Sequence, residues 1–383
     1  MCSDWTMFHG RDSHNGQSSG HGPRSSTVSW SFAPTDGYQT SGSSPIIGHD
    51  GVIYVVSGTP DSPTSPPGSH LDSVSPATHQ SLWSWTDPTE SILRSTPAVS
   101  PDGTVYLVSD QGPGNLIAVG NGGATVWKLT GLNLQGSPTI ASDGTIYVMD
   151  PSSTVYAVDP TNGQVLWNFA GSPGTVGVRG TPALSRDRSR LYVPSGGGLL
   201  YALTAGASGG ELQWSYQISG PPGGNIENAP AVDHEGTIYV ATGGNYGSTP
   251  GNIEAVRPDG TRKWSYTSDG TFETTPAVSR RGLVVAGNDV GTITALRHHD
   301  GTVAWSYQAP GTVGTNGFYN SSAAVASGGN IYIQNQLSVF AFNHKGSLEW
   351  LADEVGPYVG ASPALDGART LLVTAIGQLL AFV

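Results

Sequence analysis

The chain has 383 residues, of which 54 are glycine and 27 are proline. This share of turn-forming residues disfavours a mainly helical fold, because both residue types interrupt helices. Only 11% of the residues are charged, and the formal net charge is -12. An acidic chain of this kind lacks the many phosphate contacts that nucleic acids require, so we expect no nucleic-acid partner. Apolar runs stay well short of the roughly 18 residues of a membrane span, so we expect no transmembrane segment.

Residues 1–27 precede the first repeated unit and are predicted to form an extension that packs on the rest of the chain. They contain His9, His14 and His21, whose spacing matches no strong metal-ligand pattern, so packing is favoured over a metal site. Cys2 is the only cysteine, which excludes an intramolecular disulfide and a cysteine-based zinc cluster. The first residues do not resemble a signal peptide. Cys2 is a candidate lipid-anchor position of a bacterial lipoprotein.

After these residues the sequence repeats. Six of the eight repeats contain Ser or Thr and then Pro, followed by an apolar stretch, as in STPAVSPDGTVYLV around Pro97. The aligned positions lie 40 to 52 residues apart and are Pro45, Pro97, Pro138, Pro182, Pro230, Pro276, Ala323 and Pro363. Repeats of about 45 residues made of short apolar stretches are typical of β-propeller blades.

A second motif combines a short apolar run, a turn that contains Gly, and a Trp. The tryptophans of this motif are Trp30, Trp83, Trp127, Trp167, Trp214, Trp264, Trp305 and Trp350. Together the two motifs predict four short strands per unit. In six of the eight units a Gly stands six residues after the motif proline, as at Gly51, where a hairpin turn needs a positive φ. No helical periodicity separates the strands, which argues against a TIM barrel or a doubly wound fold.

The two ends of the chain are predicted to complete one blade together. The last unit, from Pro363 to Val383, has three strands and no Trp strand, whereas the Trp strand at residues 28–32 precedes every proline motif. Pairing these strands gives each terminal strand a partner and closes the ring. The predicted fold is therefore all-β: residues 28–383 form a single eight-bladed β-propeller of four-stranded antiparallel blades.

The segment AVDPTNGQVLW, residues 157–167, resembles the tryptophan-docking repeat of PQQ-like propellers. The opening DWTMFHGRDSHNG is similar to a segment that precedes the propeller in extracytoplasmic members. This family includes BamB-like assembly lipoproteins and quinoprotein dehydrogenases. For a dehydrogenase the resemblance implies a disulfide of adjacent cysteines, a Ca²⁺ site and a longer chain. Cys2 alone cannot form that disulfide, so we expect neither PQQ-dependent oxidation nor a cofactor.

Loop lengths predict the binding face of the ring. The turns after the proline strand and before the Trp strand are short and uniform. The connections between blades and those after the second strand are long and unlike one another, for example residues 57–72, 241–252 and 308–320. In an antiparallel blade both sets of long connections leave from one face, which we call the long-loop face. We expect binding there, because rigid scaffolds carry function on their loops.

Polar residues stand three places before the motif proline, where the chain enters the innermost strand beside the central channel. Six of these eight positions are polar: Arg94, Gln135, Arg179, Glu227, Glu273 and Asn320. One interpretation is an internal network of ion pairs and amide contacts. Another is a ligand site at the channel mouth, where the two arginines would hold an anionic or hydroxylated ligand. Within that site the two glutamates would form a catalytic acid and base pair, as in glycosidic cleavage.

Tyr319 and Tyr358 lie near inter-blade entries and are candidate platforms for a sugar or a partner side chain, with packing as the alternative. The leading hypothesis is a non-catalytic propeller that binds a protein partner or a polar or carbohydrate ligand on the long-loop face. We expect it in the periplasm, at the cell surface or secreted. The alternative is a lyase, hydrolase or cyclase that acts on a carbohydrate or polar small molecule at the channel mouth.

Overall fold

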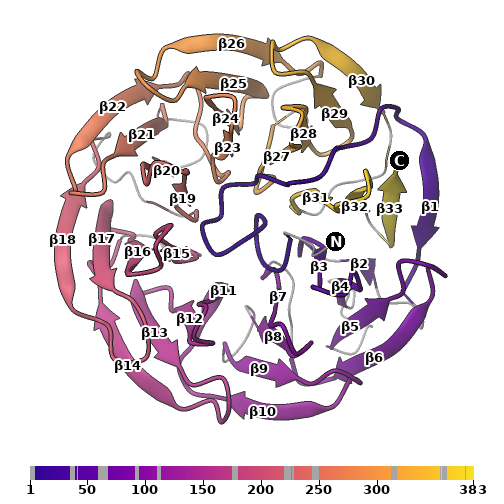
Figure 1. The fold of residues 1–383 in the computed structure, drawn as a ribbon, viewed down its shortest axis with the longest axis vertical. Coiled ribbons are helices and arrows are strands. Elements are labelled where there is room, and N and C mark those ends of the chain that lie inside the picture. The colour runs from indigo at the N-terminus through magenta and orange to yellow at the C-terminus, as the bar shows by residue number, and fades with distance from the viewer. Residues whose placement is uncertain are drawn as a thin grey trace.

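The structure is a computed structural model, which describes residues 5–34, 39–40, 42–58, 68–90, 95–109, 114–174, 180–219, 226, 228–243, 250–311, 317–353, 355, 360–375 and 377–383. These residues form 33 strands in eight sheets, which are arranged radially around a central axis (Figure 1). The predicted all-β, eight-bladed propeller is therefore confirmed. Within the described part of the chain, no helix is long and apolar enough to cross a membrane.

The first four blades run through residue 217. Blade one contains β3 (Ile46–Ile47), β4 (Ile53–Gly58), β5 (Ser69–Val74) and β6 (Ser81–Asp87), with β2 (Gln39–Thr40) also paired to β4. Blade two contains β7 (Ala98–Val99), β8 (Val105–Val108), β9 (Leu116–Val119) and β10 (Thr125–Leu129). Blade three contains β11 (Gln135–Ile140), β12 (Ile146–Met149), β13 (Thr154–Val158) and β14 (Val165–Ala170). Blade four contains β15 (Ala183–Leu184), β16 (Arg190–Pro194), β17 (Leu199–Thr204) and β18 (Leu212–Gln217).

The other four blades continue to the C-terminus. Blade five contains β19 (Ala231–Val232), β20 (Ile238–Ala241), β21 (Asn252–Val256) and β22 (Arg262–Thr267). Blade six contains β23 (Ala277–Ser279), β24 (Leu283–Gly287), β25 (Thr292–Arg297) and β26 (Val303–Gln308). Blade seven contains β27 (Ala324–Val325), β28 (Ile331–Gln334), β29 (Val339–Phe342) and β30 (Leu348–Ala352). Blade eight contains β31 (Ala364–Leu365), β32 (Leu371–Ala375), β33 (Gln378–Phe382) and β1 (Val28–Phe32).

The strand from the N-terminus closes blade eight, as predicted. β1 pairs antiparallel with β33, with Trp30 opposite Ala381 and Phe32 opposite Leu379. The indole of Trp30 also stacks on the imidazole of His79 in blade one, with ring centroids 4.3 Å apart. The last blade is therefore held by both ends of the chain and by its neighbour.

The outer strand of every blade carries a β-bulge just before its tryptophan. In blade three Trp167 lies opposite Ala157 and Val165 opposite Val158, so that Leu166 is the additional residue. The same register shift occurs in all eight blades. A bulge twists an exposed edge and hinders pairing with another sheet.

The tryptophans join each blade to the next. The indole N–H of Trp214 donates to the carbonyl oxygen of Pro258 at 3.0 Å. The ring also packs on Gly260, where φ is +86° and a Cβ atom would lie 2.8 Å from the indole. Indole donors to the following blade's turn are also found at Trp83, Trp127, Trp167, Trp264 and Trp305. The turn Gly and the Trp of the repeat are therefore complementary parts of one contact.

A ring of hydroxyl groups joins the innermost strands. The Ser or Thr before the motif proline accepts a hydrogen bond from the equivalent backbone N–H of the preceding blade, as Thr96 does from Ser44 at 3.2 Å. Six such bonds of 2.8–3.2 Å lie between the blades. The two remaining places flank Ala229, which has no hydroxyl group. The Ser/Thr-Pro pattern thus has a direct structural role.

The turns between the first two strands share one backbone geometry. All eight positions six residues after the motif proline have a positive φ, and six of them are glycine. The other two are Arg188, with a φ of +59°, and Arg369, with +76°. One expectation needs correction, because β4 continues to Gly58 and β5 begins at Ser69 within the predicted loop 57–72. Pairing with β2 extends β4 there.

Candidate functional site

The central channel is closed at the end where the short turns lie, which we call the short-turn face. Residues 5–20 cross the middle of the ring there, and Figure 1 shows this segment in indigo. Six of their carbonyl oxygens accept hydrogen bonds of 2.7–2.9 Å from the innermost strands; the donors are the N–H groups of Ile47, Val99, Leu184, Val232, Val278 and Val325. Each donor stands two residues after the motif position. The segment therefore pairs the inner edges of six blades that would otherwise be open.

Two buried histidines hold this segment in place. His9 lies with Nδ1 2.6 Å from the carbonyl oxygen of His14 and Nε2 2.7 Å from that of Ala323. His14 lies with Nε2 3.0 Å from the carbonyl oxygen of Pro182 and 2.9 Å from the hydroxyl of Thr139. Burial lowers the pKa of His9 to about 4 and also lowers the pKa of His14. Both side chains thus connect the closing segment to the blades, and their burial favours the neutral form.

The predicted residues of the channel mouth are only partly described. Gln135 begins β11 and is half-buried, Glu273 is buried before β23, and Asn320 is exposed with a φ of +55° before β27. Tyr319 is half-buried beside it. These residues come from blades three, six and seven. Arg94, Arg179, Glu227 and Tyr358 lie outside the described residues, so the ligand site at the channel mouth stays a prediction.

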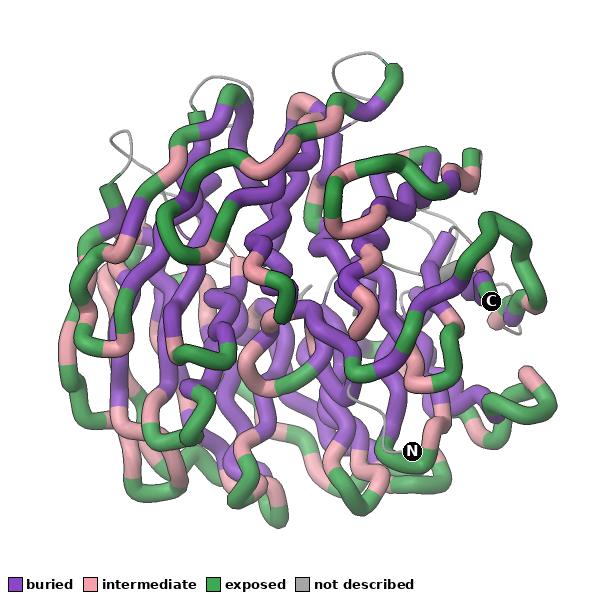
Figure 2. Tube along the Cα trace, turned by 45° about the horizontal axis from the view of Figure 1, so that its top comes forward, coloured by how far each residue is buried: buried purple, intermediate pink, exposed green. Residues whose placement is uncertain are grey.

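Exposure follows the layered construction of the ring. In Figure 2 the inner strands are largely buried, whereas exposed residues gather at the turns and along the outer strands. The antiparallel order of every blade sends the connections after the second and fourth strands to one face, as predicted from loop length. This long-loop face lies opposite the end that residues 5–20 close.

A pocket of about 550 Å³ lies on the short-turn face, between the closing segment and blades four to six. Four arginines line it: Arg11 from the segment, Arg186 and Arg188 from the β15–β16 turn, and Arg280 from the β23–β24 turn. Arg188 Nε donates to Asp12 Oδ2 at 2.6 Å. Partial burial and the neighbouring charges of Arg280 and Arg188 lower the pKa of Arg11, against the opposing effect of Asp12. The arginines are therefore close enough to repel one another.

The repeat pattern does not predict this pocket, although the sequence contains one signal for it. Arg188 stands at a turn position where six of the eight blades have glycine. A side chain in the left-handed region is uncommon and costs roughly 1 kcal/mol. The arginine at position 188, where most blades have glycine, is the signal in the sequence that points to this pocket.

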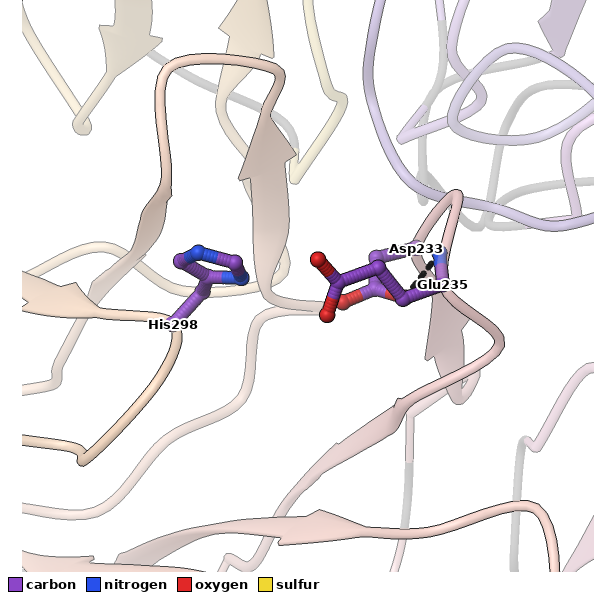
Figure 3. A group of neighbouring side chains, drawn as sticks. All are labelled: Asp233, Glu235 and His298. Carbon is purple, nitrogen blue, oxygen red and sulfur yellow. Dashed lines mark hydrogen bonds between the residues drawn. The ribbon is translucent and has the colours of Figure 1, made fainter.

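A group of possible metal ligands lies close to this pocket, in the turns of blades five and six (Figure 3). Ligand atoms of Asp233, Glu235 and His298 lie within 4.8 Å of one another. However, Asp233 Oδ1 accepts the backbone N–H groups of Glu235 and Thr237, and its Oδ2 accepts the hydroxyl of Tyr239. Asp233 thus has a complete structural role in its turn, and we assign no metal to this group.

The fold and its repeats define the class of the protein as an eight-bladed propeller of PQQ-like repeats. The chain matches the family model described as outer membrane protein assembly factor BamB over residues 67–249 and 226–353, and it belongs to this family. A search of curated proteins finds no match.

Solved structures of the same fold include both binding proteins and enzymes. BamB from Moraxella catarrhalis is 15% identical with a TM-score of 0.66, covering 93% of this chain and 98% of that one. A europium-containing methanol dehydrogenase is 13% identical with a TM-score of 0.72, covering 97% and 89%. Quinohemoprotein alcohol dehydrogenase from Comamonas testosteroni is 12% identical with a TM-score of 0.76, covering 100% and 80%. At these identities the likeness shows the fold alone.

Proposed function

We propose that this chain is a non-catalytic scaffold that acts outside the cytoplasm and binds a protein partner through its long-loop face. The observation that carries the proposal is the closure of the short-turn end of the channel by residues 5–20. This closure leaves the long-loop face as the accessible end of the ring. Membership of the BamB family and the sparse charge of the chain support an extracytoplasmic location.

Rigidity of the ring supports a presenting role. The hydroxyl ring joins the innermost strands of every blade except blade five, and the indole contacts join the outer strands to the next blade, so seven blades are fixed at two radii. We propose that these tryptophans act as the docking residues of the family's repeat. Loops held on such a frame keep a constant spacing, which lowers the entropy that a partner must remove on binding.

The alternative, an enzyme at the channel mouth, has less support. Its described candidates, Gln135, Glu273 and Asn320, come from three different blades, and a reacting centre needs groups within hydrogen-bond reach of one substrate. We therefore prefer the scaffold and keep the enzyme as the outcome that a failed partner test would favour.

A face-specific crosslinking experiment tests the scaffold. In a Cys2→Ser background, a photoactivatable crosslinker is attached to single cysteines at matched positions of two blades. Ala170→Cys and Gln308→Cys place it at the long-loop ends of β14 and β26. Asn162→Cys and His299→Cys place it on the short-turn face of the same blades. All four native residues are exposed.

The scaffold predicts protein adducts in a cell-envelope extract of the source organism from positions 170 and 308, with little from 162 and 299. Adducts of equal yield from both faces, adducts from the short-turn face alone, or no adduct from any position would contradict the proposal. Circular dichroism of each variant checks that the ring still folds.

A further inference from the structure

We propose that the arginine-lined pocket on the short-turn face binds a small multivalent oxyanion, either a phosphorylated or a polycarboxylated molecule. This site lies on the face opposite the proposed partner surface and does not depend on the scaffold proposal. Its volume of about 550 Å³ falls within the range of small-molecule pockets.

The charge of the pocket is opposite to that of the whole chain. Four arginines and two aspartates line it, which gives a formal charge of 4 − 2 = +2 with His234 neutral, against −12 for the chain. Asp12 is paired with Arg188, and Asp233 is occupied by hydrogen bonds within its own turn. These two carboxylates balance at most two of the four positive charges. A bound oxyanion would supply the missing negative charge.

Arginine suits this chemistry particularly well. Its guanidinium group presents a fixed fork of donors that matches two oxygens of a phosphate or carboxylate. The Arg280 side chain is exposed and has no ion pair or hydrogen bond within the described residues. Arg186 uses one nitrogen on the carbonyl oxygen of His234, which leaves its other donors for a ligand.

The walls of the pocket are held in a defined geometry. Asn15 Nδ2 donates to the carbonyl oxygen of Val232 at 3.2 Å, and Asn15 Oδ1 accepts the backbone N–H of Gln17 at 3.1 Å. Gln17 Oε1 in turn accepts the backbone N–H of Arg280 at 2.8 Å. Blades five and six and the closing segment are therefore joined at the pocket, so its arginines come from a framed site rather than from independent loops.

The turn of blade four gives a second observation that points to charge recognition. Arg188 occupies a left-handed position that six blades fill with glycine, and its ion pair with Asp12 is partly exposed, with 50% of the Arg188 side chain and 14% of the Asp12 side chain accessible. Exposed ion pairs contribute little to stability. Arg369 has the same backbone conformation in blade eight, so the conformation alone does not identify a ligand; at Arg188 it places a guanidinium group in the wall of the pocket.

Two matched pairs of variants test the site by calorimetric titration at low ionic strength, with inorganic pyrophosphate in one arm and citrate in the other. Arg280→Gln is compared with Arg281→Gln, its neighbour outside the pocket wall. Arg188→Gly is compared with Arg369→Gly, at the equivalent turn of blade eight. Each pair removes the same charge from the chain.

We expect one binding site per chain for at least one probe, and a loss of about tenfold or more in affinity for Arg280→Gln and Arg188→Gly. Arg281→Gln and Arg369→Gly should change affinity less than threefold. Binding of pyrophosphate alone assigns a phosphorylated ligand, and binding of citrate alone a polycarboxylate. Absence of binding by both probes, or equal losses in pocket and control variants, would overturn the proposal. A thermal melt no lower for Arg188→Gly than for wild type excludes unfolding as the cause.

Discussion

The backbone N–H of Ser362 donates a 2.8 Å hydrogen bond to Oγ of Ser44, a residue 318 positions earlier in the chain. This bond joins the innermost strands of blades eight and one. It belongs to the same hydroxyl ring that joins blades one to four and six to eight. Closure of the propeller therefore occurs at two radii, through this bond near the axis and through the pairing of β1 with β33 at the rim.

The hydroxyl ring predicts a stability cost for removing one member. Ser322→Ala removes the acceptor of the buried N–H of Thr275, which donates to Ser322 Oγ at 2.9 Å in the wild-type chain. An unpaired buried N–H costs about 1–3 kcal/mol, so the free energy of unfolding should fall by that amount in urea denaturation. Ser215→Ala, an exposed serine in β18, is the control and should change it by less than about 0.5 kcal/mol. An equal change in the free energy of unfolding for Ser322→Ala and Ser215→Ala would show that the hydroxyl-ring bond contributes nothing to stability.

The contact between Trp214 and Gly260 predicts a steric penalty that can be separated from backbone strain. Gly260 and Gly131 have φ values of +86° and +87°, but a Cβ at Gly260 meets the indole at 2.8 Å, whereas nothing lies within 4 Å of one at Gly131. Gly131→Ala should therefore cost only roughly 1 kcal/mol of left-handed strain. Gly260→Ala should cost at least about 1 kcal/mol more, because of overpacking. Identical melting temperatures for the two variants would contradict the blade contact.

The buried His9 predicts a pH dependence of the closing segment. Its pKa in the folded chain is about 4, lowered by burial from 6.5. The unfolded chain therefore binds more protons between these values, and folding stability is lost as the pH falls from about 6.5 towards 4. The shift corresponds to about 3 kcal/mol from this residue.

An NMR titration of the imidazole C–H signals checks the His9 prediction. Assignment comes from the loss of one signal in His9→Gln. The signal of His9 should show no protonation above pH 5. Protonation of His9 near pH 6.5 would mean that the imidazole of His9 is not buried between the closing segment and the blades.

The fold was predictable because each repeat contains residues whose role is local and repeated. The Trp, the turn glycine and the Ser/Thr before Pro each make one contact that recurs around the ring, so eight copies reveal it. The path of residues 5–20 was not predictable in the same way. Its bonds run from backbone carbonyl oxygens to backbone N–H groups, and these carry no side-chain pattern.

The two candidate sites also differ in how far the sequence predicts them, because only one of them follows the repeat pattern. The pocket depends on Arg11, Arg188 and Arg280, which are 177 and 92 residues apart in sequence and belong to no repeat pattern. Only their convergence at the closing segment makes them a cluster. The ring of polar residues at the channel mouth was inferred from register and stays a prediction; of its two glutamates, Glu273 is described and lies buried before β23.

Residues 5–20 close the short-turn end of the channel, and we propose that the long-loop face binds a partner. Hydrogen exchange measured by NMR tests this closure most directly at the amides of Val99, Val232 and Val278, which donate to carbonyl oxygens of that segment. We expect these three amides to exchange slowly in the full chain and fast in a variant lacking residues 1–20. The amide of Val148 in β12 should be protected in both. Fast exchange of the three amides in the full chain would contradict it.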